Sequence, residues 1–409
     1  MLLNGTLMLS SLPFAYYYDK IDVFQDFITC SFITLFFGFI MRLSTKNDRN
    51  SEIKKRDGYL IVVGGWLFMS LFGSLPFIFS GAISSFTDAF FETMSGFTTT
   101  GSTILENIEE LPKSILFWRS MTQWIGGMGI IVLTIAILPL LGIGGMELFV
   151  AEAPGPTKDK IHPRIKETAK SLWKIYLGLT ITETILLMCC GLSFFDAINH
   201  SLTTTSTGGF STKQDSIAAF DNIYVEAIIM VFMLAAGTNF TLLYFGFKLK
   251  IRKILKNDEF KWYLSSIASV ILFLTLLLSF SNNISFLSAF RKIGFQVVSI
   301  ITTTGYATAD YTTWGYFMSF IFFLFLFSGG SAGSTSGGIK IVRIIIIIKN
   351  GLLEFKRRLH PKAVIPVTLN GSAISNQIIY NLLAFIFLYL FIFTLGSILL
   401  TALGVEFLT

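Results

Sequence analysis

Long apolar runs separated by short basic segments dominate the chain from end to end. A helix that crosses a bilayer needs about 20 mainly apolar residues. By that measure the sequence predicts spans at about 24–41, 59–80, 114–141, 171–192, 223–247, 262–280, 313–348 and 374–403, with residues 1–18 as a shortened first span. This pattern predicts an all-α integral membrane protein.

Four basic segments, 42–58, 147–170, 248–261 and 349–362, lie between these spans. Cytoplasmic loops carry an excess of lysine and arginine, so we expect all four on the cytoplasmic side. Composition agrees, because 53% of the residues are hydrophobic and 14% are charged, whereas soluble domains average about 25% charged residues. The net charge of +6 sits in these segments and forms no basic groove with interleaved aromatic residues, so nucleic-acid binding is not expected.

A repeated unit of two spans enclosing a less apolar stretch recurs along the chain. The enclosed stretches, 86–104, 194–212 and 284–308, each read as a short helix, a Ser/Thr run and then glycine. The repeat predicts five regions. They are an N-terminal helix pair with its basic loop (1–58), three pore repeats (59–170, 171–261 and 262–362) and the first helix of a fourth repeat (363–409).

The Ser/Thr–Gly runs have the chemistry of a cation filter. Irregular backbone inside a membrane is tolerated only where protein or a water-filled cavity covers it, and a ring of carbonyls can replace the hydration shell of potassium. Glycine permits positive φ, and threonine adds hydroxyl oxygens. The alternative is polar packing between helices, which Ser and Thr also supply. The candidate potassium-binding residues are Thr99, Thr100, Gly101, Ser206, Thr207, Gly208, Thr303, Thr304 and Gly305.

A glycine-rich break interrupts the span at 313–348, where residues 328–340 read SGGSAGSTSGGIK. Each glycine costs about 1 kcal/mol inside a helix, so we expect the span to unwind here and form a backbone gate beneath the filter. The candidate gate residues are Gly329, Gly330, Gly333, Gly337, Gly338 and Lys340. Lys340 and Arg343 either repel cations in a closed pore or extend to the cytoplasmic interface. A phosphate-binding loop is not expected, because isoleucine follows Gly338 where that motif needs lysine.

Enzyme chemistry is not expected. The three cysteines lie in apolar stretches, the three histidines are scattered, and no HExxH or G-x-S-x-G motif occurs. Asp88, Glu92 and Asp196 lie on the predicted short helices, and we interpret them as supports that hold the loops by hydrogen bonds. Arg119 and Glu183 receive no role.

Several long strings are typical of one family. They are KKRDGYLIVV at 54–63, ELPKSILFWRSMTQWIGGMGIIVL at 110–133, APGPTKD at 153–159, TGGFST at 207–212 and GGSAGSTSGGIK at 329–340. On these strings, the chain resembles the TrkH/KtrB/HKT superfamily of potassium transporters, and the bacterial TrkH branch most closely.

The resemblance implies four pore repeats around one potassium pathway, preceded by an extra helix pair. It implies potassium uptake across the bacterial inner membrane, with K+ as the substrate ion and no cofactor. The nine filter residues above would line three quadrants, and 328–340 would be the gating loop of the third repeat. A homodimer and a cytoplasmic nucleotide-binding ring of the TrkA type are also implied.

The sequence departs from the family after the span at 374–403, where the family has a fourth filter loop and a last helix. Gly404 follows no short helix and no threonine run, so we do not take it as a filter residue. We expect an incomplete fourth repeat, which would make the chain a fragment, a truncated product or one part of a pore that another chain completes. Two functional alternatives stay open: a sodium-permeable relative, which glycine in all three runs disfavours, and a non-conducting subunit.

Overall fold

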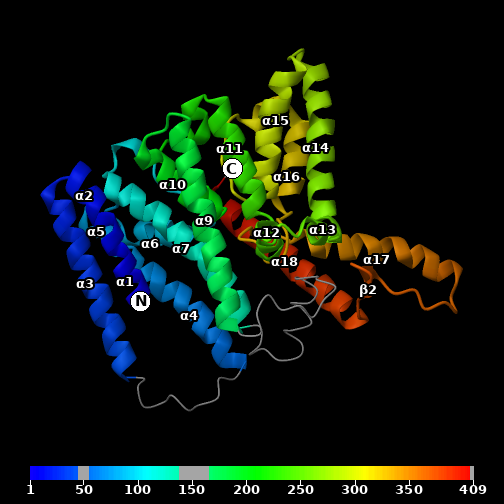
Figure 1. The fold of residues 1–409 in the computed structure, drawn as a ribbon, viewed down its shortest axis with the longest axis horizontal. Coiled ribbons are helices and arrows are strands. Elements are labelled where there is room, and N and C mark those ends of the chain that lie inside the picture. Colours follow the sequence, from blue (N-terminus) through cyan, green and yellow to red (C-terminus); the bar gives the residue numbers. More distant parts are fainter. Residues whose placement is uncertain (45–54, 138–164, 406–409) are drawn as a thin grey trace.

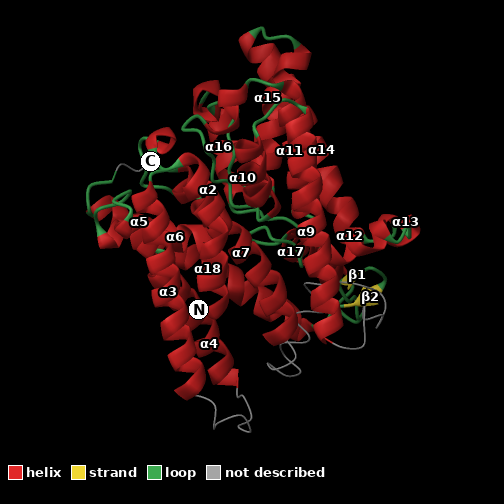
Figure 2. Cartoon of the chain, turned by 60° about the vertical axis from the view of Figure 1, so that its left-hand side comes forward, coloured by secondary structure: helices red, strands yellow, loops and turns green. Residues whose placement is uncertain are grey.

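The structure is a computed structural model that describes residues 1–44, 55–137 and 165–405. Helices make up most of this part of the chain and pack into one bundle (Figures 1 and 2). The described residues add a single two-stranded hairpin. The expected all-α architecture is therefore confirmed.

An N-terminal helix pair precedes the repeats. The helices α1 (Leu2–Met8), η1 (Leu9–Ser11) and α2 (Leu12–Tyr18) follow one another closely and pack on α3 (Ile21–Ser44). The helices α1 and α3 approach closely at glycines, since a Cβ on Gly38 would lie 3.1 Å from the backbone nitrogen of Leu2. The Ser31 hydroxyl donates to the Gly5 carbonyl at 2.6 Å. Residues 1–44 therefore form a closely packed helix pair.

Three repeats follow in chain order. The first holds α4 (Lys55–Gly73), α5 (Leu75–Phe79), α6 (Phe86–Phe97), η2 (Ile108–Glu110) and α7 (Lys113–Ile137). The second holds α9 (Ile165–Cys189), α10 (Phe194–Thr205), η3 (Ser216–Phe220), α11 (Ile223–Ala236), α12 (Phe240–Phe247) and α13 (Ile251–Leu255). The third holds α14 (Asp258–Asn282), α15 (Phe286–Ile301), η4 (Tyr311–Trp314), α16 (Tyr316–Leu326) and α17 (Ile341–Leu359). The last elements are β1 (Thr368–Leu369), β2 (Ser372–Ala373) and α18 (Asn376–Ala402).

The short helices α6, α10 and α15 begin in the same way. Each has a serine at its N-cap, Ser85, Ser193 and Ser285, whose hydroxyl accepts a bond from the amide three residues later. Such a cap satisfies one of the amides that a helix start leaves without a partner. The sequence repeat is therefore a repeat of local structure as well.

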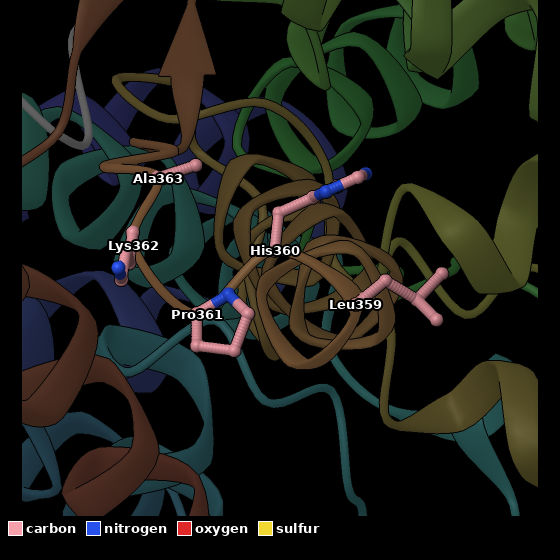
Figure 3. Close-up of a pocket in the computed structure, with 5 residues that line it drawn as sticks. All are labelled: Leu359, His360, Pro361, Lys362 and Ala363. Carbon is pink, nitrogen blue, oxygen red and sulfur yellow. The ribbon is translucent and has the colours of Figure 1, made fainter.

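Two predicted spans are broken: the break at 313–348 was expected, whereas the expectation of one continuous helix at 223–247 was wrong. The span at 223–247 bends by 109° between α11 and α12, where Asn239 caps the new helix by accepting from the Thr241 amide at 2.8 Å. The span at 313–348 stops at Leu326 and resumes at Ile341. The glycine-rich segment between them is unwound, as expected. Beyond it, α17 runs across the direction of α14 (Figure 1) and ends at an open hollow lined by residues 359–363 (Figure 3).

By length and apolar composition, five helical stretches of the described chain could cross a membrane: Ile21–Ser44, Leu60–Phe79, Ala169–Cys189, Asp258–Ser281 and Asn376–Ala402. The bent pair α11–α12 would be a sixth. The span expected at 114–141 corresponds to α7, which is buried from Ser114 to Met128 at the centre of the bundle, while residues 138–141 lie outside the described part. Large exposed apolar side chains such as Phe387 (70%) and Phe36 (52%) cover the outward faces, as lipid contact requires.

Gly126 tests the close packing of α7. A Cβ on Gly126 would overlap the Phe97 carbonyl oxygen at the end of α6. Overpacking of this kind costs about 1–3 kcal/mol, so Gly126→Ala should lower the thermal unfolding temperature in detergent by several degrees. The control is Gly178→Ala on α9, where a Cβ meets nothing within 4 Å and the unfolding temperature should hold or rise. Equal stability of both variants would contradict the packing.

Candidate cation pathway

The three Ser/Thr–Gly runs share one backbone conformation. Directly after each short helix has ended, a threonine adopts positive φ: Thr99 at 54°, Thr207 at 53° and Thr303 at 57°. A β-branched residue rarely enters this region, and such strain persists only where the surroundings enforce it. Three equivalent threonines in the same strained conformation mark the loops as one repeated device.

The hydrogen bonds of the loops repeat as well. The amide after each positive-φ threonine returns to a carbonyl inside its own short helix at 2.9 Å: Thr100 to Ser95, Gly208 to Thr203 and Thr304 to Ser299. One residue later φ is again positive, at Gly101 (80°), Gly209 (80°) and Gly305 (83°). The loops therefore superpose in conformation residue by residue.

This register differs from the predicted one in the second loop. The alignment by sequence paired Gly208 with Gly101 and Gly305, whereas the structure gives that place to Gly209. Ser206 accordingly corresponds to Thr98 and Thr302, each of which directly follows its short helix. Two adjacent glycines made the sequence ambiguous by one residue, and only the backbone angles separate them.

The loops touch one another in chain order. A Cβ on Gly101 would overlap the Gly208 carbonyl oxygen, and a Cβ on Gly209 would overlap the Thr304 carbonyl oxygen. In both cases the carbonyl belongs to the residue directly before the equivalent glycine of the next loop. Gly305, the third equivalent glycine, has no described atom within 4 Å of such a Cβ. The three loops form consecutive parts of a ring.

Gln123 on α7 holds the second loop from the first repeat. Its Nε2 donates to the Gly208 carbonyl at 2.8 Å, and its Oε1 accepts from the Phe210 amide at 3.1 Å. The side chain is fully buried. Both ends of the amide are therefore used to fix the backbone around Gly209.

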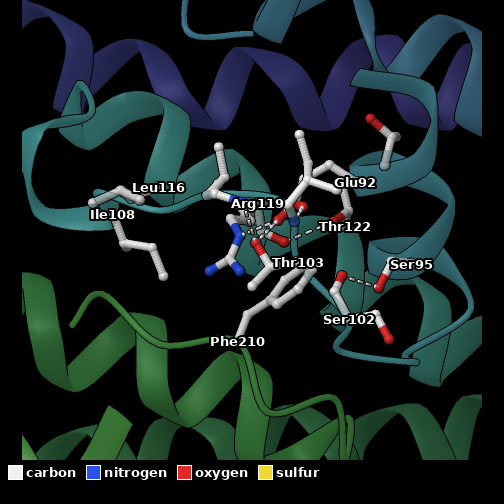
Figure 4. Close-up of polar contacts among 12 residues, drawn as sticks. Glu92, Ser95, Ser102, Thr103, Ile108, Leu116, Arg119, Thr122 and Phe210 are labelled. Atoms are coloured by element: carbon white, nitrogen blue, oxygen red, sulfur yellow. Dashed lines mark hydrogen bonds and ion pairs between the residues drawn. The ribbon is translucent and has the colours of Figure 1, made fainter. Parts of the chain in front are cut away.

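One helical turn earlier, Arg119 forms a buried ion pair with Glu92 (Figure 4). Arg119 Nε lies 2.6 Å from Glu92 Oε1, and both side chains are at most 3% exposed. Glu92 also accepts from the Thr103 hydroxyl at 3.0 Å and the Ile104 amide at 3.1 Å. The guanidinium lies over the Phe210 ring, 3.5 Å from its centre, and donates to the Ser211 carbonyl at 3.1 Å. The pair ties the end of the first loop to the second.

The interpretation of Glu92 as a loop support is confirmed, and so is that of Asp196, which accepts from the Thr212 hydroxyl at 2.7 Å. Asp88 contributes its backbone amide to the Ser85 cap. The roles of Arg119 and Gln123 were missed. Their signal was present, because two polar residues four positions apart in an apolar span share a helix face.

Tyr306 connects the third loop to the second short helix. Its hydroxyl donates to the His200 carbonyl at 3.1 Å and contacts the Thr203 hydroxyl. The ring is 1% exposed. Gln123 and Arg119 thus connect the first repeat to the second loop by hydrogen bonds, and Tyr306 connects the third loop to the second repeat.

The glycine-rich segment 328–340 lies against the second and third loops. The Thr335 hydroxyl donates to the Thr205 carbonyl at 3.1 Å, and the Ser336 hydroxyl donates to the Thr302 carbonyl at 2.7 Å. The Gly337 amide donates to the Thr303 hydroxyl at 2.6 Å. The segment therefore contacts the ends of two short helices and one candidate filter threonine.

The candidate gate glycines allow this segment to fold back on itself. A Cβ on Gly329 would overlap the Gly337 carbonyl, and Gly333 and Gly338 adopt φ of 69° and 63°. The Gly329 amide donates to the Ile339 carbonyl at 2.8 Å. Gly330 is buried, and a Cβ there would lie 2.6 Å from both the Gly237 carbonyl oxygen and the Ser336 hydroxyl.

Lys340 and Arg343 both turn toward protein. The Lys340 ammonium donates to the Ser336 carbonyl and lies 3.4 Å from the Ser334 hydroxyl. The Arg343 guanidinium lies over the Phe385 ring of α18, 3.8 Å from its centre. Both cations are therefore held by contacts within the protein.

The site has no cluster of metal-ligating side chains. Among the residues that the structure describes, no group of three or more His, Cys, Asp or Glu could hold a metal ion. Carbonyl and hydroxyl oxygens are the available ligands, and they suit a weakly bound monovalent cation.

Short capped helices that lead into contacting loops define a multi-pass membrane protein of the pore-loop class. Residues 24–407 match the family model of TrkH, described as a cation transport protein, and the chain belongs to this family. It is 41% identical to the Trk system potassium uptake protein TrkH of Salmonella typhimurium over 99% of this chain and 84% of that protein.

Two further relatives agree. The Trk system potassium uptake protein TrkG of Escherichia coli is 35% identical over 98% of this chain and 83% of its own length. The crystal structure of the potassium transporter TrkH from Vibrio parahaemolyticus matches with a TM-score of 0.89 and 38% identity, over 99% of this chain and 84% of that one. The family resemblance read from the sequence is confirmed.

The ion pair that joins the loops can be tested by a mutant cycle. Removing one partner of a buried pair leaves an uncompensated charge and costs about 3–5 kcal/mol. Arg119→Met should therefore lower the unfolding temperature in detergent far more than a surface change does. Adding Glu92→Gln to Arg119→Met should recover part of that loss. A double variant less stable than Arg119→Met would contradict the pairing.

Proposed function

We propose that the protein takes up potassium across the bacterial inner membrane through a channel-like pore. The observation that carries this proposal is the threefold repeat of a strained threonine and a positive-φ glycine on loops that meet carbonyl to glycine. The relatives named as potassium uptake proteins supply the ion. K+ is the substrate, and the proposal includes neither a cofactor nor a catalytic step.

In this proposal the filter consists of the nine residues identified in the sequence together with Gly209. Their carbonyl and hydroxyl oxygens replace the water of the ion. The C-terminal ends of α6, α10 and α15 lead directly into the loops, so the negative ends of their dipoles favour a cation. Residues 59–170, 171–261 and 262–362 each contribute one loop, residues 1–58 support the first, and residues 363–409 begin a further repeat.

The segment 328–340 is the proposed gate. Its contacts with Thr205, Thr302 and Thr303 put it directly against the proposed filter. Lys340, held by the same segment, adds a positive charge that opposes cation passage while the segment keeps this conformation. Displacement of the segment then opens the path.

Assembly follows the family. We propose a homodimer in the bilayer whose opening is controlled by a cytoplasmic nucleotide-binding ring of the TrkA type. The segment 248–261 is tied to the hairpin that follows the segment 349–362, because Asp258 and Asn370 exchange hydrogen bonds at 2.7 Å. We propose these two basic segments as the docking region for such a partner.

Complementation tests the transport proposal. The chain, expressed with its cytoplasmic partner in a bacterium that lacks potassium uptake, should restore growth at low potassium. Absence of growth, with membrane expression shown, would favour a non-conducting role. Growth accompanied by equal sodium influx would favour the sodium-permeable alternative.

Selectivity should depend on the positive-φ glycines. Gly101→Ser, Gly209→Ser and Gly305→Ser each force a Cβ into a strained backbone, so the ratio of potassium to sodium uptake should fall, by about tenfold for a loss near 1.4 kcal/mol. Gly191→Ser is the matched control, since Gly191 also has positive φ (96°) but lies between α9 and α10, outside the proposed filter. Unchanged selectivity in all three filter variants would refute the filter.

Basal flux should depend on the contacts of the gate. Thr335→Val with Ser336→Ala removes two hydrogen bonds to short-helix carbonyls, and shortening 330–337 removes the segment itself. Both should raise 86Rb+ flux in proteoliposomes that lack the cytoplasmic partner. Thr394→Val with Ser397→Ala on α18 is the control, because these hydroxyls bond only carbonyls of their own helix. Flux that stays unchanged in folded protein would remove the gate from the proposal.

A further inference from the structure

The first turn of α14 contacts two separate parts of the chain through adjacent residues. Asp258 bonds to the β1–β2 hairpin, and Glu259 bonds to the glycine-rich segment. No motif in the sequence marks either residue. Because neighbouring residues in one helical turn move together, the two contacts are mechanically linked.

The inner contact is a buried carboxylate. Glu259 is 0% exposed, and its Oε1 accepts from the Ala332 amide at 2.6 Å. Its second oxygen has no hydrogen-bond partner among the described residues. A buried acid held by one short backbone bond is costly, so this bond strongly favours the present position of the segment.

The outer contact is a reciprocal pair. The Asp258 amide donates to Asn370 Oδ1, and the Asn370 amide donates to Asp258 Oδ2, both at 2.7 Å. Asn370 thereby satisfies an amide at the start of α14 that the helix itself leaves without a partner. Two bonds in opposite directions fix both the distance and the orientation of the hairpin.

The hairpin is a stiff element. Its two-residue turn, Asn370-Gly371, has φ of 50° and 79°, the type I′ geometry that suits a tight hairpin. Leu369 (4% exposed) and Val367 (0%) anchor it in the hydrophobic core. Lys349 on α17 also donates to the Thr368 carbonyl at 3.0 Å. If the hairpin moves as a unit, its two bonds with Asp258 should therefore move the start of α14 with it.

We infer that Asp258 and Glu259 form a joint through which the position of the cytoplasmic hairpin sets the position of the intramembrane segment 328–340. Glu259 is a positioning residue: it acts on the ion path through Ala332 and the bonds of Thr335 and Ser336 to the short helices. The inference rests on the proposed gate, since only a gate turns the position of this segment into flux.

Hydrogen–deuterium exchange of the full chain in detergent tests the joint without requiring transport. Glu259→Ala should speed exchange in the peptide covering 327–340 by about tenfold, in line with loss of one buried hydrogen bond. Glu259→Gln keeps an acceptor for Ala332 and should stay close to the unmodified protein. The first loop, 86–104, should be unaffected in both.

The outer half of the joint is tested by Asn370→Gly. Glycine keeps the positive φ of the turn and removes only the side chain that caps α14. Exchange in 327–340 should again rise, and the effect should not add to that of Glu259→Ala, because both variants break one linkage. Glu354→Ala on α17, an exposed acid paired only within its helix, is the matched control and should change nothing.

The outcomes separate the joint from the gate. Unchanged exchange in Glu259→Ala would overturn the role of Glu259, and a rise with Glu259→Ala but not with Asn370→Gly would overturn the coupling to the hairpin. In flux measurements, shortening 330–337 serves as the reference. If shortening raises flux and Glu259→Ala does not, the joint fails while the gate stands; if neither raises flux, the gate fails and this inference falls with it.

Discussion

Backbone that leaves the helical conformation inside a membrane must find hydrogen-bond partners in the protein, because lipid offers none. The three loops after α6, α10 and α15 meet this requirement in two ways. Their first amides return to their own short helices. In the second loop, the carbonyls and amides that follow are held by Gln123 and Arg119 of the first repeat. In the first and third loops, Ser95 and Ser299 of the preceding short helices hold a later carbonyl. The shape of the second loop is thus a property of the assembled bundle.

This dependence explains why the polar residues of α7 are buried at the centre of the bundle. A glutamine or an arginine in an apolar helix is expensive unless every donor has a partner. Gln123 uses both ends of its amide, and Arg119 is shared between Glu92, Ser211 and the Phe210 ring. The cost of burial is offset only when the first two loops are in place. Correct folding and correct loop geometry are therefore coupled.

Much of the fold could be predicted from the sequence, because spans, capped short helices and a glycine-rich break are local patterns. The failures were tertiary. The bend between α11 and α12 depends on Gly237, where a Cβ would lie 2.6 Å from the Tyr263 hydroxyl of another repeat. The register of the second loop was ambiguous because Gly208 and Gly209 are adjacent. The partners of Arg119 lie 27 and 92 residues away in sequence, beyond the reach of any local pattern.

The three Ser/Thr–Gly loops and the segment 328–340 are held by bonds of different strength. A buried ion pair and a doubly bonded glutamine secure the loops. The hydrogen bonds that hold the segment 328–340 against the loops come from Thr335, Ser336 and Gly337, each worth about 0.5–1.5 kcal/mol net. These three bonds together contribute a few kcal/mol, which is the range in which two conformations can both be populated, and the Glu259 bond to Ala332 adds to them from α14. A partner that supplies that much differential binding energy can move the segment while the loops above it keep their shape.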